Sequence, residues 1–230
     1  MLDYANYNAR AKYWPILEDV SQGLPHTLTA YSRSWELPWI YTEADLDGSP
    51  CEVLDAGCGN SIFPSFLARK GHRVSVVDLV GNGTDGIDAF LGREENQGIP
   101  YRIEDIRDLG WPDETFDRVV SMSVIEHITD PSGPLDAVKE LTRVLKTGGR
   151  LAVTTDLNLS RFASDLTRLV KWPLALEGLR LLRPGALFDR EILADPDIIF
   201  SRRGEILDHK RFWQVKDVYV TVGFTVVKEG

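Results

Sequence analysis

Two glycines and two acids in the first third of the chain have the clearest chemical pattern. Gly57 and Gly59 follow an apolar stretch that ends in Asp55, and Asp78 lies 19 residues after Gly59 (78 − 59). Glycines let a loop turn tightly and let a ligand approach the backbone N–H groups. An acid about 20 residues further on is placed to accept hydrogen bonds from the hydroxyls of a ribose. The spacing predicts a site for a nucleoside-containing cofactor.

Two features distinguish this loop from a dinucleotide-binding loop. A carboxylate at Asp55 suits a cationic group, such as an amino-acid ammonium, better than a pyrophosphate. A dinucleotide fingerprint also has a third glycine three residues after Gly59, where this chain has Ile62. A nicotinamide-dependent oxidoreductase is therefore the weaker alternative. A non-catalytic interaction protein of the same fold is a further alternative.

These residues need a parallel sheet to position them. Strand-like and helix-like stretches alternate between residues 51 and 156. We expect strands at Glu52–Asp55, Arg73–Asp78, Tyr101–Ile103, Phe116–Met122 and Arg150–Thr155, and helices at Ile62–Lys70 and Pro134–Leu145. The predicted fold class is α/β, with a doubly wound, mostly parallel seven-stranded sheet and helices on both faces. Ligands bind such sheets beyond the carboxyl ends of the strands, where the strand order reverses.

The 230 residues are predicted to form a single domain, 1–230, in four segments. Residues 1–50 are rich in aromatic side chains and read as a helical lead-in, and 51–156 form the cofactor-binding core. Residues 157–213 are rich in Leu and Arg and are split by prolines, which indicates a helical lid or acceptor insertion; its basic side chains either face an anionic or polyhydroxylated ligand or form a solvated helix face. Residues 214–230 are expected to form a C-terminal helix or strand, and a compact hairpin over 218–227 is one alternative.

Composition limits the partners of the protein. A net charge of −9 and a pI near 5.0 argue against a general binder of nucleic acid or anionic membranes. No apolar run approaches the roughly 20 residues that span a bilayer, and the N-terminus lacks the apolar core of a signal peptide, so we expect a cytoplasmic protein. Cys51 and Cys58 are predicted to be reduced thiols. The expected partner is a small-molecule or saccharide acceptor, and a homodimer is left open.

Four segments together resemble the class I methyltransferases that depend on S-adenosylmethionine (SAM). They are VLDAGCGN, VVDLV, IEDIRDLGWPDETFDRVVSMSVIEHITDP and LKTGGRLAVTT, and they cover roughly residues 51–156. The resemblance implies SAM as cofactor. It implies that the methionine end is held by Asp55, Gly57 and Gly59, the ribose hydroxyls by Asp78, the adenine by Leu79, Asp105 and Ile106, and the sulfonium side by Ser121 and Met122. The third loop glycine of the family is Ser61 here.

Methyl transfer from a sulfonium is an in-line displacement, so the protein mainly aligns the reacting atoms and excludes water. A hydroxyl acceptor must also lose its proton, either to a base or with the help of a metal ion. His127 is the first candidate base and His209 the second, while His26 and His72 are expected at the surface. In some methyltransferases a Glu-x-x-Glu-His pattern binds a metal, and by this resemblance Glu126 and His127, with Asp156, could bind Mg2+. Alternatively, His127 only packs or forms hydrogen bonds.

The acceptor is expected to be a hydroxyl on a small molecule or saccharide. The aromatic lead-in has Arg33, Trp35, Glu36 and Trp39 close together, which suits stacking on flat or sugar faces, although core packing explains the tryptophans equally well. No Asn-Pro-Pro-Tyr-like motif of the nucleic-acid amino-methylating enzymes follows Phe116–Met122. The whole chain resembles bacterial sugar O-methyltransferases, including the mycobacterial enzymes of methylmannose polysaccharides.

Overall fold

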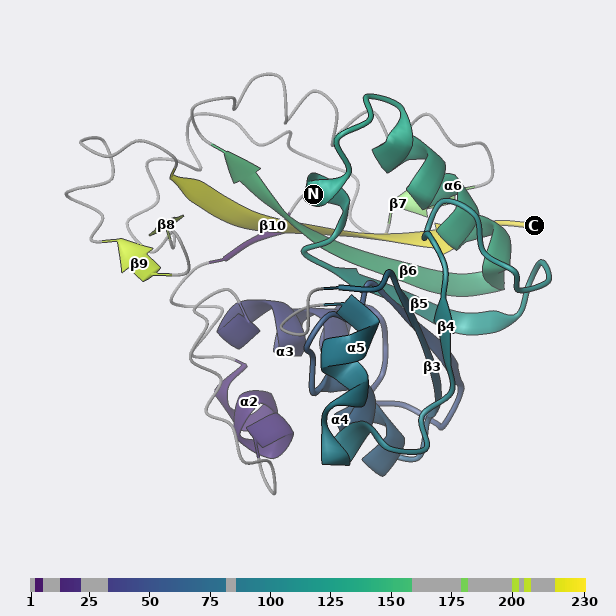
Figure 1. The fold of residues 1–230 in the computed structure, drawn as a ribbon, viewed down its shortest axis with the longest axis horizontal. Helices are drawn as coiled ribbons and strands as arrows, with labels where there is room; N and C mark the ends of the chain where they lie inside the picture. The colour runs from purple at the N-terminus through teal and green to yellow at the C-terminus, as the bar shows by residue number, and fades with distance from the viewer. Residues whose placement is uncertain are drawn as a thin grey trace.

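A computed structural model describes residues 3–5, 13–21, 33–81, 86–158, 179–181, 200–202, 205–207 and 218–230. One mixed sheet forms its centre (Figure 1), and its strands follow the order β4-β3-β2-β5-β6-β10-β8-β9, with β1 and β7 also paired to β10. The main strands are β2 (Glu52–Ala56), β3 (Arg73–Asp78), β4 (Tyr101–Ile103), β5 (Phe116–Met122), β6 (Leu145–Asn158) and β10 (Tyr219–Lys228). The short ones are β1 (Asp3–Tyr4), β7 (Leu179–Leu181), β8 (Phe200–Arg202) and β9 (Glu205–Leu207).

The strand order creates a binding edge. The strands β4, β3, β2, β5 and β6 are parallel, and β10 runs antiparallel to β6. From β2 the chain adds β3 and β4 on one side and then β5 and β6 on the other. The order therefore reverses between β2 and β5, which is where open α/β sheets bind their ligands.

Helices cover both faces of the sheet (Figure 1). They are α2 (Trp14–Ser21), α3 (Arg33–Glu43), α4 (Phe63–Arg69), α5 (Gly86–Leu91) and α6 (Gly133–Val144), with the 3-10 turns η1 (Glu94–Asn96) and η2 (Ile125–His127). Successive strand residues point to opposite faces, so Leu54 packs in the cluster that contains α6, whereas Val53 packs in the cluster that contains α3, α4 and α5. The site edge is thus supported by a core on each side.

Helix α3 is packed firmly against the sheet. Trp35 and Trp39 stack with their ring centroids 5.3 Å apart, and both are almost fully buried. A Cβ atom added to Gly223 of β10 would lie 2.6–2.8 Å from the Trp39 ring. Only glycine allows this close approach, which fixes the position of α3 against β10.

The predicted α/β class and doubly wound arrangement are confirmed, but details differ. The described residues contain ten strands, five of them only two or three residues long, instead of seven. Within 157–213, the described residues are the end of β6 and the strands β7, β8 and β9, so the helical prediction is wrong for them. The predicted hairpin over 218–227 is also wrong, because β10 is one continuous strand paired along β6. The division of the chain into four segments stays a prediction.

Two smaller expectations can also be compared. His72 is buried rather than at the surface, with Nε2 lying 2.9 Å from the Leu46 carbonyl oxygen; His26 lies outside the described residues. Cys51 and Cys58 are free thiols.

Among the described residues, no helix combines the length and the apolar character that a membrane crossing requires.

Candidate cofactor and acceptor site

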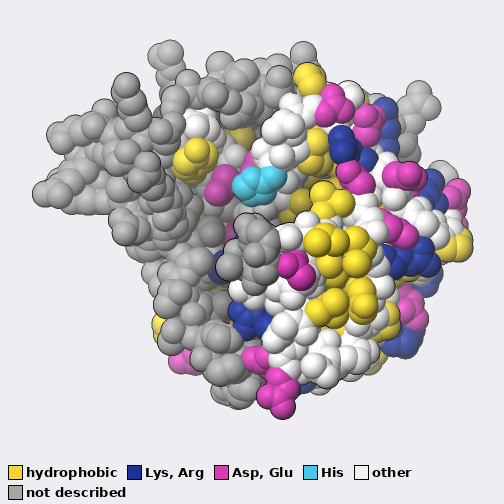
Figure 2. Space-filling model, viewed as in Figure 1, with side chains coloured by type: hydrophobic (Ala, Val, Ile, Leu, Met, Phe, Trp, Pro, Cys, Tyr) yellow, Lys and Arg dark blue, Asp and Glu magenta, His cyan; other side chains and the backbone are white. Residues whose placement is uncertain are grey.

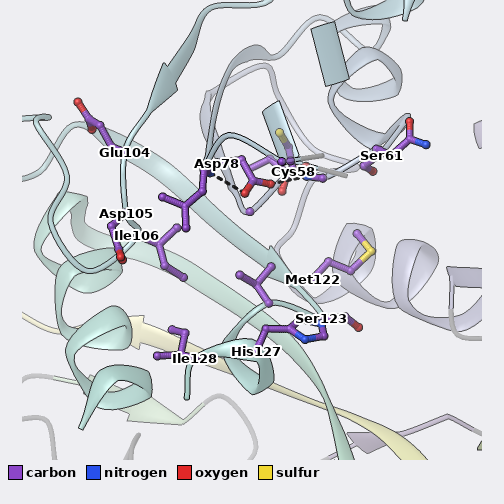
Figure 3. Close-up of a pocket in the computed structure, with 18 of the residues that line it drawn as sticks. Cys58, Ser61, Asp78, Glu104, Asp105, Ile106, Met122, Ser123, His127 and Ile128 are labelled. Carbon is purple, nitrogen blue, oxygen red and sulfur yellow. Dashed lines mark hydrogen bonds between the residues drawn. The ribbon is translucent and has the colours of Figure 1, made fainter. Parts of the chain in front are cut away.

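A cavity of about 890 Å³ opens at the carboxyl ends of β2, β3 and β5. Most of the predicted cofactor residues line it, namely Asp55, Gly57, Gly59, Asp78, Leu79, Asp105, Ile106 and Met122. Figure 3 shows Asp78 and Cys58 on one side of this pocket and His127 and Ile128 on the other. The residues come from four chain segments, so the fold brings the predicted site together.

The glycine loop is held in one shape by hydrogen bonds. Gly57 has φ +83° and donates its N–H to the Val77 carbonyl at 2.8 Å; a Cβ atom there would lie 2.4 Å from Val124 Cγ2. The Gly59 N–H, at φ +51°, donates to Asp78 Oδ2 at 2.6 Å. These backbone angles favour glycine. The bond to Asp78 ties the loop to the end of β3, so the residues predicted to hold the methionine and the ribose are linked directly.

Asp55 is the most unusual carboxyl group in the pocket. It is 1% exposed, and its Oδ2 has no hydrogen-bond partner among the described residues. Burial, followed by the charge of Asp78, raises the pKa of Asp55 to about 7, while Arg33 acts in the opposite direction. A buried carboxylate normally has donors. An ammonium group of a ligand in this pocket would supply the missing donor, which fits the amino-acid end of SAM.

The predicted adenine end combines open apolar surface with an anchored acid. Leu79 and Val80 are 54% and 65% exposed, and Figure 2 shows hydrophobic side chains gathered over β4 and α5 on this face. Arg107 donates to Asp105 through Nε at 2.9 Å and Nη2 at 2.6 Å, and these bonds hold the pKa of Asp105 below its usual range. Asp105 is therefore an ionised acceptor at the pocket wall.

One of the predicted cofactor residues lies outside the pocket lining. Ser121 does not line the pocket: its side chain is fully buried and its hydroxyl donates to the Ala56 carbonyl at 2.9 Å, joining β5 to β2. Met122 lines the pocket as expected, and Ser123, which follows it, lines it as well. The serine near the end of β5 that lines the pocket is thus Ser123, two residues after Ser121.

The three predicted metal ligands do not form a metal-binding group. His127 lines the pocket from η2. Glu126 instead accepts hydrogen bonds from Thr155 Oγ1 at 3.0 Å and from the Asp156 N–H at 3.3 Å, and burial raises the pKa of both acids. Across the described parts of the chain, no three His, Cys, Asp or Glu side chains group so that they could hold a metal ion. The Mg2+ prediction therefore has no support in this geometry.

The second candidate base and the N-terminal helix α3 also have to be compared with the sequence predictions. His209, the second candidate base, lies outside the described residues. Arg33 and Leu37 of α3 line the pocket, although the sequence suggested only stacking or core roles for this segment. The Arg33 guanidinium donates to Glu36 at 3.0 Å and lies near enough to Asp55 to affect its pKa. In the sequence, Arg33 is only a single arginine beside several aromatic residues. This pattern does not show how α3 packs, so the place of Arg33 in the pocket could not be predicted from it.

Comparison with known proteins agrees with this site. Residues 54–153 match the family described as "Methyltransferase domain". The matched segment contains the glycine loop, the switch point of the sheet and most of the pocket lining. Residues 54–153 therefore resemble a methyltransferase domain in sequence, and they lie in the part of the chain that has the predicted α/β fold.

Two relatives with similar sequences are named as O-methyltransferases. The ubiquinone biosynthesis O-methyltransferase of Xanthomonas oryzae pv. oryzae is 32% identical over 116 residues, which cover 50% of this chain and 47% of that protein. That of Xylella fastidiosa is 37% identical over 120 residues, covering 52% and 46%. The chain thus spans about half the length of the curated relatives it matches.

Solved structures share the fold along most of the chain. The [4+2]-cyclase SpnF has a TM-score of 0.58 at 18% identity and covers 94% of this chain and 93% of its own. At such identities the likeness concerns the fold alone. Because a protein named as a cyclase has this fold, the activity has to be argued from the residues in the pocket.

Proposed function

We propose that the protein transfers the methyl group of SAM to a hydroxyl on a small molecule or saccharide. The observation that carries this proposal is Asp55, a buried carboxyl group with an unpartnered oxygen in the pocket lining. SAM has an ammonium for this oxygen, and its carboxylate would pair with Arg33 in the same lining. Asp78 and Asp105 would accept from the ribose and the adenine amino group.

His127 is the proposed base. It lies in the lining with Met122 and Ser123, in the turn that follows β5 (Figure 3). Bound SAM would supply an electrophilic methyl group, so that the acceptor oxygen would bond to the methyl carbon as the carbon–sulfur bond breaks and leaves its electron pair on sulfur. The hydroxyl proton moves to an imidazole nitrogen of His127. The curated relatives named O-methyltransferases support a hydroxyl acceptor.

The first experiment measures binding and transfer with the purified chain. We expect calorimetry to show binding of SAM and of its product, S-adenosylhomocysteine (SAH), and labelled SAM to methylate a member of a panel of phenols, polyols and mannosides. The panel is assayed with Mg2+ and with a chelator, which separates a metal-assisted reaction from one that relies on His127. Binding of SAH without transfer to any acceptor would favour the non-catalytic alternative. Tight NAD binding with no SAH binding would favour the oxidoreductase.

A second experiment tests the base. His127→Ala should lower kcat by about 10²–10⁴-fold, the usual contribution of general base catalysis, while SAH affinity changes little. Thr129→Ala is the matched control, because Thr129 lines the same loop of the pocket and has no proposed proton-transfer role. Equal kcat values for the two variants would refute the assignment of His127.

A further inference from the structure

Glu36 of α3 is a fully buried acid next to the pocket, although it is not part of the pocket lining. Carboxylates are rarely buried completely unless they are paired. Two of its neighbours, Arg33 and Ser123, do line the pocket. Glu36 thus lies directly behind two residues that would contact bound ligands.

Three side chains donate to the Glu36 carboxylate. Arg33 Nη1 donates to Oε2 at 3.0 Å, while Ser123 Oγ and Thr154 Oγ1 donate to Oε1 at 2.5 Å and 2.6 Å. The donors come from α3 itself, from the residue that follows β5 and from β6. Hydrogen bonds to an ionised group are about twice as strong as neutral ones. Glu36 therefore joins the N-terminal helix to two strands at the carboxyl edge of the sheet.

Ser123 needs this support because of its backbone. It has φ +53°, in the left-handed region that residues other than glycine seldom adopt. Its N–H donates to the Thr154 carbonyl at 3.0 Å, and its hydroxyl donates to Glu36. Such strained residues persist where the surroundings hold them. The two bonds hold Ser123 at the pocket wall.

The geometry points to Glu36 as a positioning residue for ligand binding: it holds the guanidinium of Arg33 at the pocket and fixes the direction of the Ser123 hydroxyl proton. This inference rests on the proposed function. Because the Ser123 proton points to Glu36, the oxygen can only accept a hydrogen bond from the pocket side. Ser123 would then select a donor there, such as the ammonium of SAM or the hydroxyl of the acceptor.

Arg33 is restrained by the same carboxylate. Its side chain is 36% exposed and would otherwise sample many rotamers. With Glu36 fully buried, the ion pair is anchored at one end, and the remaining guanidinium donors can bind a ligand carboxylate at a lower entropic penalty. The acid thus increases affinity without contacting the ligand.

The test compares Glu36→Gln with Glu43→Gln, a buried glutamate of the same helix that does not line the pocket. SAH affinity is measured by calorimetry, the KM for SAM and kcat by methyl transfer, and stability by urea unfolding. We expect Glu36→Gln to weaken SAH binding by about tenfold or more, as for loss of a charged hydrogen bond, and to raise the KM for SAM more than it lowers kcat. Glu43→Gln should change only stability. Equal SAH affinity in Glu36→Gln and the wild type would overturn the inference.

A double-mutant cycle tests whether Glu36 affects SAH affinity through Arg33. In an Arg33→Ala background, Glu36→Gln should lose most of its effect on SAH affinity, because the positioned group is gone. If Glu36→Gln weakens SAH binding by the same factor with and without Arg33→Ala, Glu36 does not act through Arg33, and that part of the inference is overturned.

A second variant covers the case in which Glu36→Gln fails to fold. Ser123→Ala removes the hydroxyl from the pocket side and should weaken SAH binding or raise the acceptor KM by several fold, and unchanged values of both would overturn the role of Ser123. Failure of the proposed function gives a different result, since the wild-type chain would then neither bind SAH nor transfer a methyl group.

Discussion

Replacing Asp55 with asparagine should stabilise the protein without ligand and weaken its binding of SAH. Asp55 is 1% exposed, has an unpartnered oxygen and has a pKa raised to about 7 by burial and by Asp78. Ionisation of this carboxyl group therefore opposes folding. Asparagine has nearly the same shape and carries no charge.

The pH dependence follows from proton linkage. The pKa of Asp55 rises from 3.8 to about 7 on folding, so the folded state binds more protons than the unfolded state between these pH values. The free energy of unfolding of the wild type therefore falls as the pH rises through this window. At about 1.4 kcal/mol per pH unit, the difference between Asp55→Asn and wild type should grow from near zero at pH 4 to at most about 4 kcal/mol above pH 7.

The assay is urea unfolding of the free protein at about pH 4 and about pH 8.5, near the lower end of that window and above its upper end. SAH calorimetry at pH 8.5 follows, where we expect Asp55→Asn to bind about 10- to 100-fold more weakly, because a charged hydrogen bond to the ligand ammonium is lost. Lower stability of Asp55→Asn than of wild type at pH 8.5 would refute the desolvation argument. Unchanged SAH affinity would refute the ammonium contact.

Three other changes probe the rest of the site. Gly57→Ala should lower the free energy of unfolding by about 1–3 kcal/mol and reduce SAH binding, because φ is +83° and the new Cβ would meet Val124 Cγ2 at 2.4 Å; a wild-type urea midpoint would contradict this. Arg107→Ala removes the donors that hold Asp105, so its pKa should rise, as NMR titration can show, and affinity for adenosine should fall. Burial raises the pKa of Glu126, so Glu126→Gln should be more stable than wild type above neutral pH and no more stable near pH 4; parallel stability–pH curves would indicate normal ionisation.

Several strands could be predicted from the sequence because they are short runs that contain β-branched residues and end at turn residues, whether they are buried like β3 and β5 or exposed like β4. The expected bounds of Arg73–Asp78, Tyr101–Ile103 and Phe116–Met122 coincide with β3, β4 and β5. The helix over 134–145 was predicted within one residue of α6 at each end. These signals are local, since each depends on the periodicity and turn residues of a single segment.

Some site residues could not be predicted correctly, because their positions depend on contacts between segments that are far apart in the sequence. In a strand, neighbouring side chains point in opposite directions, so whether Ser121 or its neighbours face the ligand depends on how β5 sits against β2. Arg33 and Glu36 precede the glycine loop by more than twenty residues, and only the packing of α3 brings them to the pocket. The Glu126 carboxylate faces Thr155 because of the pairing of β6 with its neighbours. No spacing rule in the sequence records these contacts.

Strand β10 has a consequence for synthesis of the protein. Its residues Val220, Val222, Phe224 and Val226 are all buried in the sheet core, and β10 covers the outer edge of β6 from Arg150 to Asn158. During translation, β6 emerges well before residues 219–228, so its apolar edge stays available for pairing with other chains in the meantime. The cofactor loops could form early on the ribosome, but the nascent chain should remain prone to aggregation until β10 has been made.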